Sequence, residues 1–367
     1  MEQPLRSETA PVEPSAREIA SPTPGAKMLN PQRATRLLVL AAVLGVCDRN
    51  YWLYSNTDHY FGGYWIQFVR GTGGAPEQYR IGVKMVAWWF VKHLSWGFRH
   101  GFTLMDVIAS TVGVLLVYQL LLERPAIRAA STVFQWFASA GFVLLVCYYM
   151  AWAGMFFRPE TLPSFGLAAC MAWFWTHRPD KGSGTWTIGG LLVCAAAQAW
   201  VRADIPCALN AGMFLASLPR TGAGLSIPRR AALVTSALCI AVAVGIQLYI
   251  MRVLYPHASY GSTPLFMVTH DLRQPLAFPP FLIFMLPLMW TGVQAWRQRT
   301  VLDTCNRGLL TGAVIYFLLW VVLGKLDEVR IFIPFAVVLI PLTMELAVRR
   351  IVPGAPLGAD TNRGVEV

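Results

Sequence analysis

The chain has 367 residues, of which 56% are hydrophobic and 13% are charged, and its formal net charge is +11. Soluble domains carry roughly a quarter charged residues, so this composition excludes a water-soluble globular class. The positive charge does not indicate a nucleic-acid partner, because most Lys and Arg residues lie at the ends of apolar segments, where membrane topology places them. We expect an all-α, polytopic transmembrane helical bundle.

The chain divides into three predicted parts. Residues 1–31 are rich in Pro, Ser, Ala and Glu and predict a disordered cytoplasmic tail rather than a signal peptide. Residues 32–350 form the predicted integral membrane domain, and residues 351–367 form a second cytoplasmic tail.

About ten apolar segments are predicted to span the membrane as helices, because backbone groups in lipid must satisfy their own hydrogen bonds. In chain order, their approximate bounds are Leu37–Tyr54, Leu104–Leu122, Val133–Met155, Leu162–Trp175, Ile188–Trp200, Ile205–Leu218, Ala231–Leu254, Pro280–Trp296, Leu309–Leu323 and Ile331–Leu346.

The charges of the connecting loops support this topology. With the N-terminus in the cytoplasm, the predicted inner stretches are "ERPAIR", "THRPDKG", "PRTGAGLSIPRR", "RQRTVLDTCNR" and the final "RRIVPG". Each carries Arg or Lys, as the positive-inside rule requires. We therefore expect a multi-pass protein of the bacterial cytoplasmic (inner) membrane, with both termini in the cytoplasm.

The segment 79–101 is long enough to cross the membrane, but it carries several basic residues. A central Lys costs about 2.5 to 3.5 kcal/mol in the hydrocarbon, and a crossing here would invert every later loop. Arg80, Lys84, Lys92 and Arg99 fall near one face at helical spacing. We interpret the segment as an amphipathic juxtamembrane helix in the first outer loop, and a charged transmembrane helix is the alternative.

The sequence contains no local motif for several common chemistries. It has no G-x-S-x-G, H-E-x-x-H or Walker motif, so serine-triad hydrolysis, zinc proteolysis and ATP-driven work lack local support. The seven cysteines show no spacing typical of a metal site or a disulfide framework. We predict no cofactor and no metal ligands; a divalent metal stays open, but no D-x-D motif supports one.

The predicted outer loops gather the unusual ionisable residues. Such residues at membrane depth usually pair or line a water-filled cavity. A single pair is explained equally well as an interfacial ion pair, but five loops of this kind favour a polar extracytoplasmic cavity. In loop order, the candidates are Asp58, Arg80 and Lys84; Arg158 and Glu160; Arg202 and Asp204; His257, His270 and Arg273; and Glu328 and Arg330.

These residue types suit a lipid-phosphate substrate. Arg and Lys bind phosphate through charge-assisted hydrogen bonds, and apolar helices hold a lipid chain. A carboxylate near the membrane surface can act as general base on an attacking hydroxyl or amide.

Four stretches are similar to the GT-C class of membrane glycosyltransferases, which take a sugar from a polyprenyl-phosphate carrier. They are "TDHYFGGYW", "PEQYRIGVKM", "RPETLPSFGLAA" and "DEVRIFIPFAVVLIPL". The first resembles the acidic stretch after the first span in protein mannosyltransferase and aminoarabinose transferase relatives. It departs from their usual Asp-Glu pair, because His59 follows Asp58.

The resemblance implies a transferase that uses a polyprenyl-phosphate-linked sugar, with a glycan, lipid or protein as acceptor and membrane lipid around it. Asp58 would be the general base, or the acid that organises the acceptor. Arg80 and Lys84 would contact the lipid phosphate. The remaining predicted site residues would clamp the phosphate, pair with the clamps or line the cavity: Arg158, Arg202, Arg273 and Arg330; Glu160, Asp204 and Glu328; and His257 and His270.

Other functions stay open at this point. A polymerase or ligase of surface polysaccharide would use the same carrier. A transporter or flippase of a lipid-linked or anionic solute would also need a cationic cavity, although no internal repeat of spans is visible. A non-catalytic membrane scaffold would tolerate changes at Asp58.

Overall fold

The computed structural model describes the chain from residue 30 to residue 351, with gaps. The described ranges are 30–61, 63–155, 158–177, 184–219, 225–258, 267, 271, 273, 276, 278–299, 302–324 and 328–351. Within these ranges the regular elements are all helices and no strand occurs. The predicted all-α class is therefore confirmed.

Helices occupy all ten predicted apolar segments, and the last of these segments holds two short helices. These helices are α1 (Pro31–Phe61), α4 (Phe98–Leu122), α6 (Thr132–Met155), α7 (Thr161–Thr176), α8 (Gly184–Arg202), α9 (Asp204–Ser217), α10 (Arg229–Tyr249), α12 (Phe278–Arg297), α13 (Thr304–Leu323), α14 (Ile333–Val338) and α15 (Ile340–Ile351). Shorter elements connect them: α2 (Tyr64–Val69), η1 (Glu77–Tyr79), α3 (Gly82–Leu94), α5 (Pro125–Arg128), η2 (Ile250–Leu254) and η4 (Val329–Phe332).

Seven helices in the described part of the chain are long and apolar enough to cross a membrane, so the chain is a multi-pass membrane protein. They are α1, α4, α6, α8, α10 with η2, α12 and α13. The pair formed by η4–α14 and α15 is bent by 57° and gives an eighth span if it is counted as one. The predicted count of about ten is not confirmed, because α7 has 16 residues and α9 has 14.

The bend between α14 and α15 has a local cause in the sequence. α14 ends at Val338 and α15 begins at Ile340. Pro341 follows in the first turn of α15, and its missing N–H cannot continue the hydrogen-bond pattern of a straight helix. The predicted last span is therefore two short helices that are nearly completely buried in the bundle.

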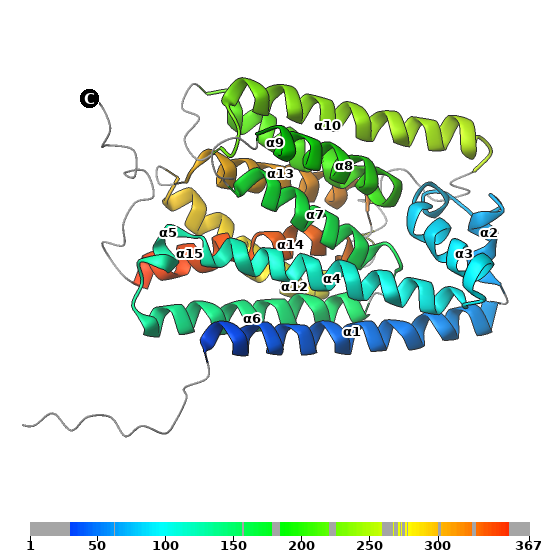
Figure 1. Cartoon of the computed structure of the whole chain (residues 1–367), viewed down its shortest axis with the longest axis horizontal. Helices are drawn as coiled ribbons and strands as arrows, with labels where there is room; N and C mark the ends of the chain where they lie inside the picture. Colours follow the sequence, from blue (N-terminus) through cyan, green and yellow to red (C-terminus); the bar gives the residue numbers. More distant parts are fainter. Residues whose placement is uncertain are drawn as a thin grey trace, which may run out of the picture.

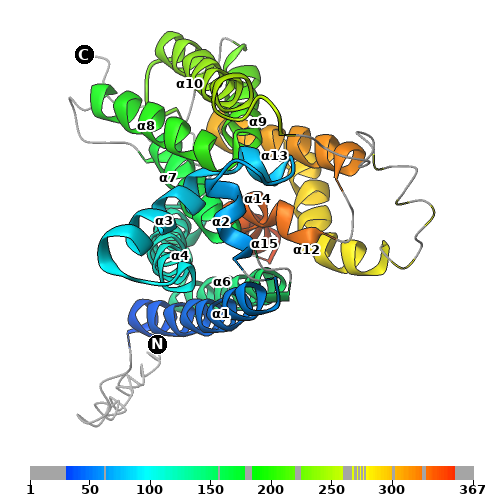
Figure 2. The ribbon, with the colours of Figure 1, turned by 90° about the vertical axis from the view of Figure 1, so that its right-hand side faces the viewer.

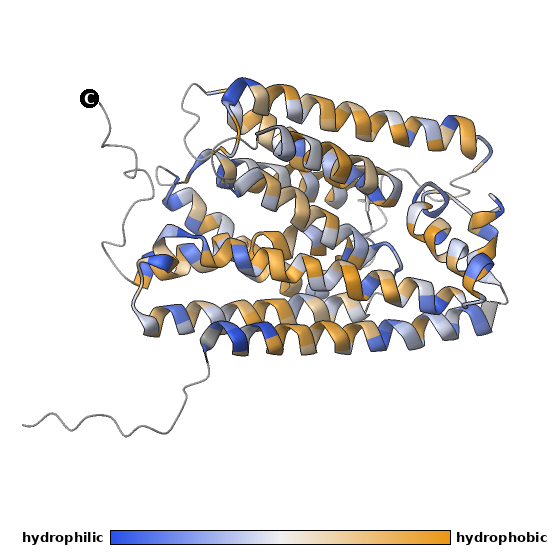
Figure 3. Ribbon diagram, in the orientation of Figure 1, coloured by the Kyte–Doolittle hydropathy of each residue, from blue (hydrophilic) through white to orange (hydrophobic). Residues whose placement is uncertain are grey.

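The helices run back and forth, so the ends that flank the predicted outer loops lie at one end of the bundle (the right-hand end in Figure 1). The first residues of α1 and the last residues of α15 lie at the opposite end. Figure 2 looks at the former end and shows α2 and α3 lying across it. Hydrophobic residues dominate the middle of the long helices, and hydrophilic residues gather toward the ends (Figure 3).

The structure confirms part of the interpretation of segment 79–101 and corrects the rest. Helix α3 has 13 residues and is absent from the candidate spans among the described helices, and it exposes apolar side chains such as Met85 and Trp89. However, the predicted shared face of Arg80, Lys84, Lys92 and Arg99 is wrong. Lys84 is buried on the protein side of α3, the residues Arg80 and Arg99 lie outside this helix, and Lys92 is exposed.

Close helix packing depends on glycine at one contact in particular. Helix α9 lies against α13, and a Cβ on Gly212 would meet the backbone oxygen of Gly308 and the backbone nitrogen of Gly312. Backbone atoms cannot rotate away as a flexible side chain does. On α10, by contrast, a Cβ on Gly245 would meet nothing within 4 Å.

We expect Gly212→Ala to destabilise the protein by about 1 to 3 kcal/mol, the usual cost of overpacking. Gly245→Ala is the matched control, and it should be neutral or stabilising by up to about 1 kcal/mol, because Ala favours a helix. Thermal unfolding in detergent would measure both. Equal melting temperatures for the two variants would contradict the close α9–α13 contact.

Candidate functional site

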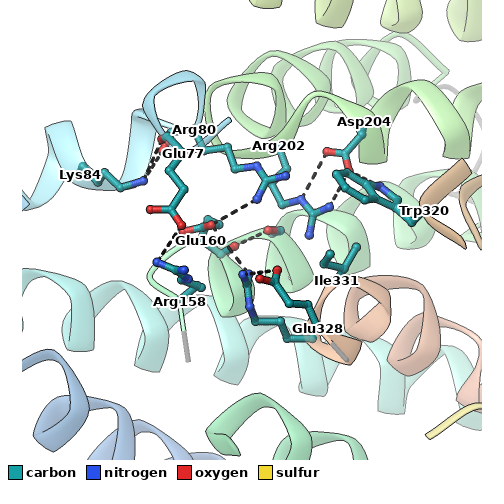
Figure 4. A network of polar contacts seen from close by, with 12 residues as sticks. Glu77, Arg80, Lys84, Arg158, Glu160, Arg202, Asp204, Trp320, Glu328 and Ile331 are labelled. Carbon is teal, nitrogen blue, oxygen red and sulfur yellow. Dashed lines mark hydrogen bonds and ion pairs between the residues drawn. The ribbon is translucent and has the colours of Figure 1, made fainter. Parts of the chain in front are cut away.

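Charged side chains from four separate segments meet at the end of the bundle that carries the predicted outer loops (Figure 4). We call this group the polar cluster. Its members are Glu77, Arg80, Lys84, Arg158, Glu160, Arg202, Asp204, Glu328 and Arg330. Eight of the nine are predicted site residues, so the structure brings most of the predicted set together.

Glu160 is the most enclosed carboxylate of the polar cluster, with a residue exposure of 1%. Its Oε1 atom lies 3.6 Å from Nη1 of Arg80 and 4.0 Å from Nη1 of Arg330. Burial by itself would raise the pKa of the Glu160 carboxyl, but Lys84, Arg330, Arg80 and Arg158 together hold that pKa well below its usual range. Glu160 is therefore an anion that neutralises surrounding cations.

Lys84 is buried and binds backbone carbonyls. Its Nζ donates hydrogen bonds to the carbonyl oxygens of Glu77, at 3.2 Å, and Arg80, at 3.1 Å, and it lies over the ring of Phe68. Burial lowers the pKa of the Lys84 ammonium, and the charges of Glu160 and Glu77 oppose that shift. These contacts fix the first turn of α3 against the η1 segment.

Arg202 is likewise committed to contacts within the protein. Its Nη2 donates to Oδ2 of Asp204 and to the hydroxyl of Tyr316, both at 2.6 Å, and its guanidinium lies 5.3 Å from the ring centre of Trp320. Trp320 Nε1 donates to the same Asp204 oxygen, and the Tyr316 hydroxyl donates to the carbonyl of Ile331. Arg202 thus joins the ends of α8, α9, α13 and η4.

A cavity of about 530 Å³ opens beside the polar cluster. Its charged lining residues are Glu77, Arg80, Arg158, Glu328 and Arg330. The rest of its wall is aromatic, apolar or amide: Tyr64, Gln67, Phe68, Gly74, Ala75, Pro76, Met267, Trp320, Leu323, Gly324 and Ile331. Neither Lys84 nor Arg202 is among the lining residues, so these two predicted phosphate contacts do not face the cavity.

The arginines of the cavity differ in how firmly they are held. Arg158 Nη1 lies 2.8 Å from Oε1 of Glu77, whose other oxygen accepts a hydrogen bond from Tyr64. Arg330 Nη2 donates to Glu328 at 2.8 Å, and its Nη1 is buried without a hydrogen-bond partner in the described residues. Among the described residues, the Arg80 guanidinium makes longer contacts, to Oε1 of Glu160 at 3.6 Å and to the ring of Trp320 at 5.6 Å. Its guanidinium is the least committed of the three.

Asp58 lies elsewhere at the same end of the bundle. It is exposed near the end of α1 and lines a second cavity of about 340 Å³. Its neighbours there include Ser55, His59, Arg99 and His100. The structure does not bring Asp58 into the larger cavity.

Two further predicted residues, His257 and Arg273, are not brought to the polar cluster. His257 is exposed in the turn after η2, and Arg273 is also exposed. His270 lies outside the described residues. Within the described ranges, no group of three or more His, Cys, Asp or Glu side chains is arranged to hold a metal ion.

Sequence reasoning missed a buried acid in the middle of an apolar segment. Asp106 lies in α4, inside the candidate span Phe98–Leu122, and is fully buried. The signal was available, because a single acid interrupts the apolar run "TLMDVIASTVGVLL" and an ionisable residue inside a span is a functional candidate by default. Asp106 lies outside every predicted loop, which is where the other candidate residues were found.

Comparisons with protein-family models, curated proteins and solved structures found no match to this chain.

We expect Glu160→Gln to destabilise the protein by about 3 to 5 kcal/mol, because removing one partner of a buried ion pair leaves the other uncompensated. Glu328→Gln is the matched control, since its carboxylate is one-third exposed and its loss should cost far less. Chemical unfolding of both variants at neutral pH would measure the difference. Similar losses would contradict the central position of Glu160.

The stability difference between the wild type and Glu160→Gln should also depend on pH. The pKa of Glu160 is depressed in the folded state, so its contribution is fully present above about pH 4.3, the ordinary Glu value, and is lost as pH falls below it. Unfolding midpoints measured from neutral to acid pH should therefore converge. A constant difference down to the lowest pH would contradict an ionised Glu160.

Proposed function

We propose that the chain is a membrane glycosyltransferase that moves a sugar from a polyprenyl-phosphate carrier to a glycan, lipid or protein acceptor. In this proposal the polar cluster faces the extracytoplasmic side of a bacterial cytoplasmic membrane, and both termini are cytoplasmic. The observation that carries it is a cavity with three arginines and an aromatic wall at the end of an apolar helical bundle.

The arginines suit the leaving group of such a transfer. When the bond between sugar and carrier breaks, negative charge grows on the lipid phosphate, and fixed cations stabilise it most where water is excluded. Glu77 and Glu328 hold Arg158 and Arg330 in place before substrate arrives. Arg80 lies at longer distances from its partners than the other two arginines do, so its guanidinium keeps N–H groups for a phosphate.

The wall of the cavity suits the rest of the donor. Tyr64, Phe68 and Trp320 supply aromatic faces, and Gln67 supplies an amide. Ligand cavities typically combine such apolar surface with a few polar groups that fix orientation. The apolar helices beside the cavity would hold the polyprenyl chain.

Asp58 is proposed as the group that activates the acceptor, on the basis of the resemblance to GT-C enzymes. Because it lines the second cavity, the acceptor would occupy that cavity and reach the donor from there. Glu328 is the alternative base, since its carboxylate is one-third exposed and lines the donor cavity.

Two other functions share these features. A polysaccharide polymerase or ligase would use the same donor cavity and differ only in its acceptor. A transporter or flippase of a lipid-linked anion is favoured by one observation, the acid Asp106 inside a span, because intramembrane acids often serve proton-coupled transport.

The proposed function is tested in a deletion strain by mass spectrometry of lipid-linked and surface glycans. We expect one sugar to disappear from the surface glycans, its lipid-linked donor to accumulate, and the wild-type gene to restore both. Arg158→Ala should reduce transfer at least tenfold, because a hydrogen bond to a charged group contributes about 1.5 to 3 kcal/mol. Arg252→Ala, an exposed arginine after α10, is the control and should restore transfer.

Two further variants separate the possible bases. Asp58→Asn should abolish transfer and Glu328→Gln should retain it if Asp58 activates the acceptor, and the reverse result would assign that role to Glu328. An unchanged glycan profile in the deletion strain would overturn the glycosyltransferase proposal. Accumulation of the donor only on the cytoplasmic leaflet would favour the flippase.

A further inference from the structure

Asp106 occupies an unusual place for an acid. It lies in α4 within a candidate span, and its exposure is 0%. Two side chains of α1 donate hydrogen bonds to its Oδ2 atom: the Asn50 amide at 3.1 Å and the Tyr54 hydroxyl at 2.8 Å. One carboxyl oxygen of α4 therefore accepts two hydrogen bonds from α1.

Two oxygen atoms beside this contact, one on Asp106 and one on Asn50, are acceptors without hydrogen-bond partners among the described residues. Oδ1 of Asp106 and Oδ1 of Asn50 are both buried and make no hydrogen bond among the described residues. The nearby hydroxyl of Ser110 is already used, because it donates to the backbone carbonyl of Asp106. An ionised carboxylate only accepts hydrogen bonds, whereas a protonated one has an O–H group that donates.

The charges around Asp106 do not compensate an anion. The titratable groups that act on it are Cys47 and Tyr54 of α1 and the anionic Glu160 ahead of α7. From α3, the cation Lys84 is directed to the carbonyls of Glu77 and Arg80. Asp106 is in none of the ion pairs of the described residues.

We propose that Asp106, Asn50 and Tyr54 form a proton-binding site in the membrane interior, with the proton on Oδ1 of Asp106. The proton removes a charge that burial and the neighbouring Glu160 both disfavour. It also gives Oδ1 a hydrogen to donate, where the ionised group leaves a buried oxygen without a partner. The site stands independently of the glycosyltransferase proposal, because it follows only from the α1–α4 contact.

Infrared spectroscopy of the protein in lipid bilayers at neutral pH tests this site. A protonated carboxyl gives a carbonyl stretch that an ionised carboxylate lacks. We expect such a band in the wild type, with a shift in heavy water and a second shift when aspartate is isotopically labelled at the side-chain carboxyl carbon. The band should be absent in Asp106→Asn. It should be unchanged in the control Asp48→Asn, which alters an exposed acid of α1 two residues before Asn50.

Tyr54→Phe provides a second variant in case Asp106→Asn does not fold. It removes only the hydroxyl that donates to Oδ2, so the band should persist and move to higher frequency. The proposal is overturned if the wild type lacks the band, if Asp106→Asn retains it, or if Tyr54→Phe leaves its frequency unchanged.

Discussion

The burial of Glu160 among cations is the constraint on which the functional end of this protein depends. Its carboxylate lies close to Arg80 and Arg330, and Lys84 and Arg158 add to the positive field around it. Such an anion in a low-dielectric site requires its partners to stay in place. The segments that carry those partners come from distant parts of the sequence, so one buried charge joins them beside the larger cavity.

Around that centre, the charged residues divide into two groups. Lys84 and Arg202 donate hydrogen bonds to carbonyl, carboxylate and hydroxyl oxygens within the protein and hold helix ends together. Arg80, Arg158 and Arg330 line the cavity and retain donor capacity. Cations that are held in place but keep unused N–H donors suit an anionic ligand, because they need little reorganisation when the ligand binds. This division is the physical basis for proposing a phosphate-binding cavity.

The sequence predicted the meeting of the outer loops but not the direction of each side chain. Apolar segment length and loop charge place residues 158–160, 202–204 and 328–330 at one end, and the structure confirms that arrangement. Helical spacing placed Lys84 on one face with Arg80, Lys92 and Arg99, whereas its ammonium turns inward to the carbonyls of Glu77 and Arg80, which only the folded chain brings within reach. Likewise, no pattern near Asp58 indicates which cavity it lines, because that depends on the approach of the 97–100 segment.

Binding of a lipid-carrier phosphate in the larger cavity can be observed by electron cryo-microscopy of the full chain in lipid nanodiscs with polyprenyl phosphate added. We expect phosphate density within hydrogen-bond distance of Arg80 and Arg158, with the lipid chain leaving along the apolar helices. Phosphate density only at the exposed face of α3, or an unchanged cavity at saturating ligand, would contradict it.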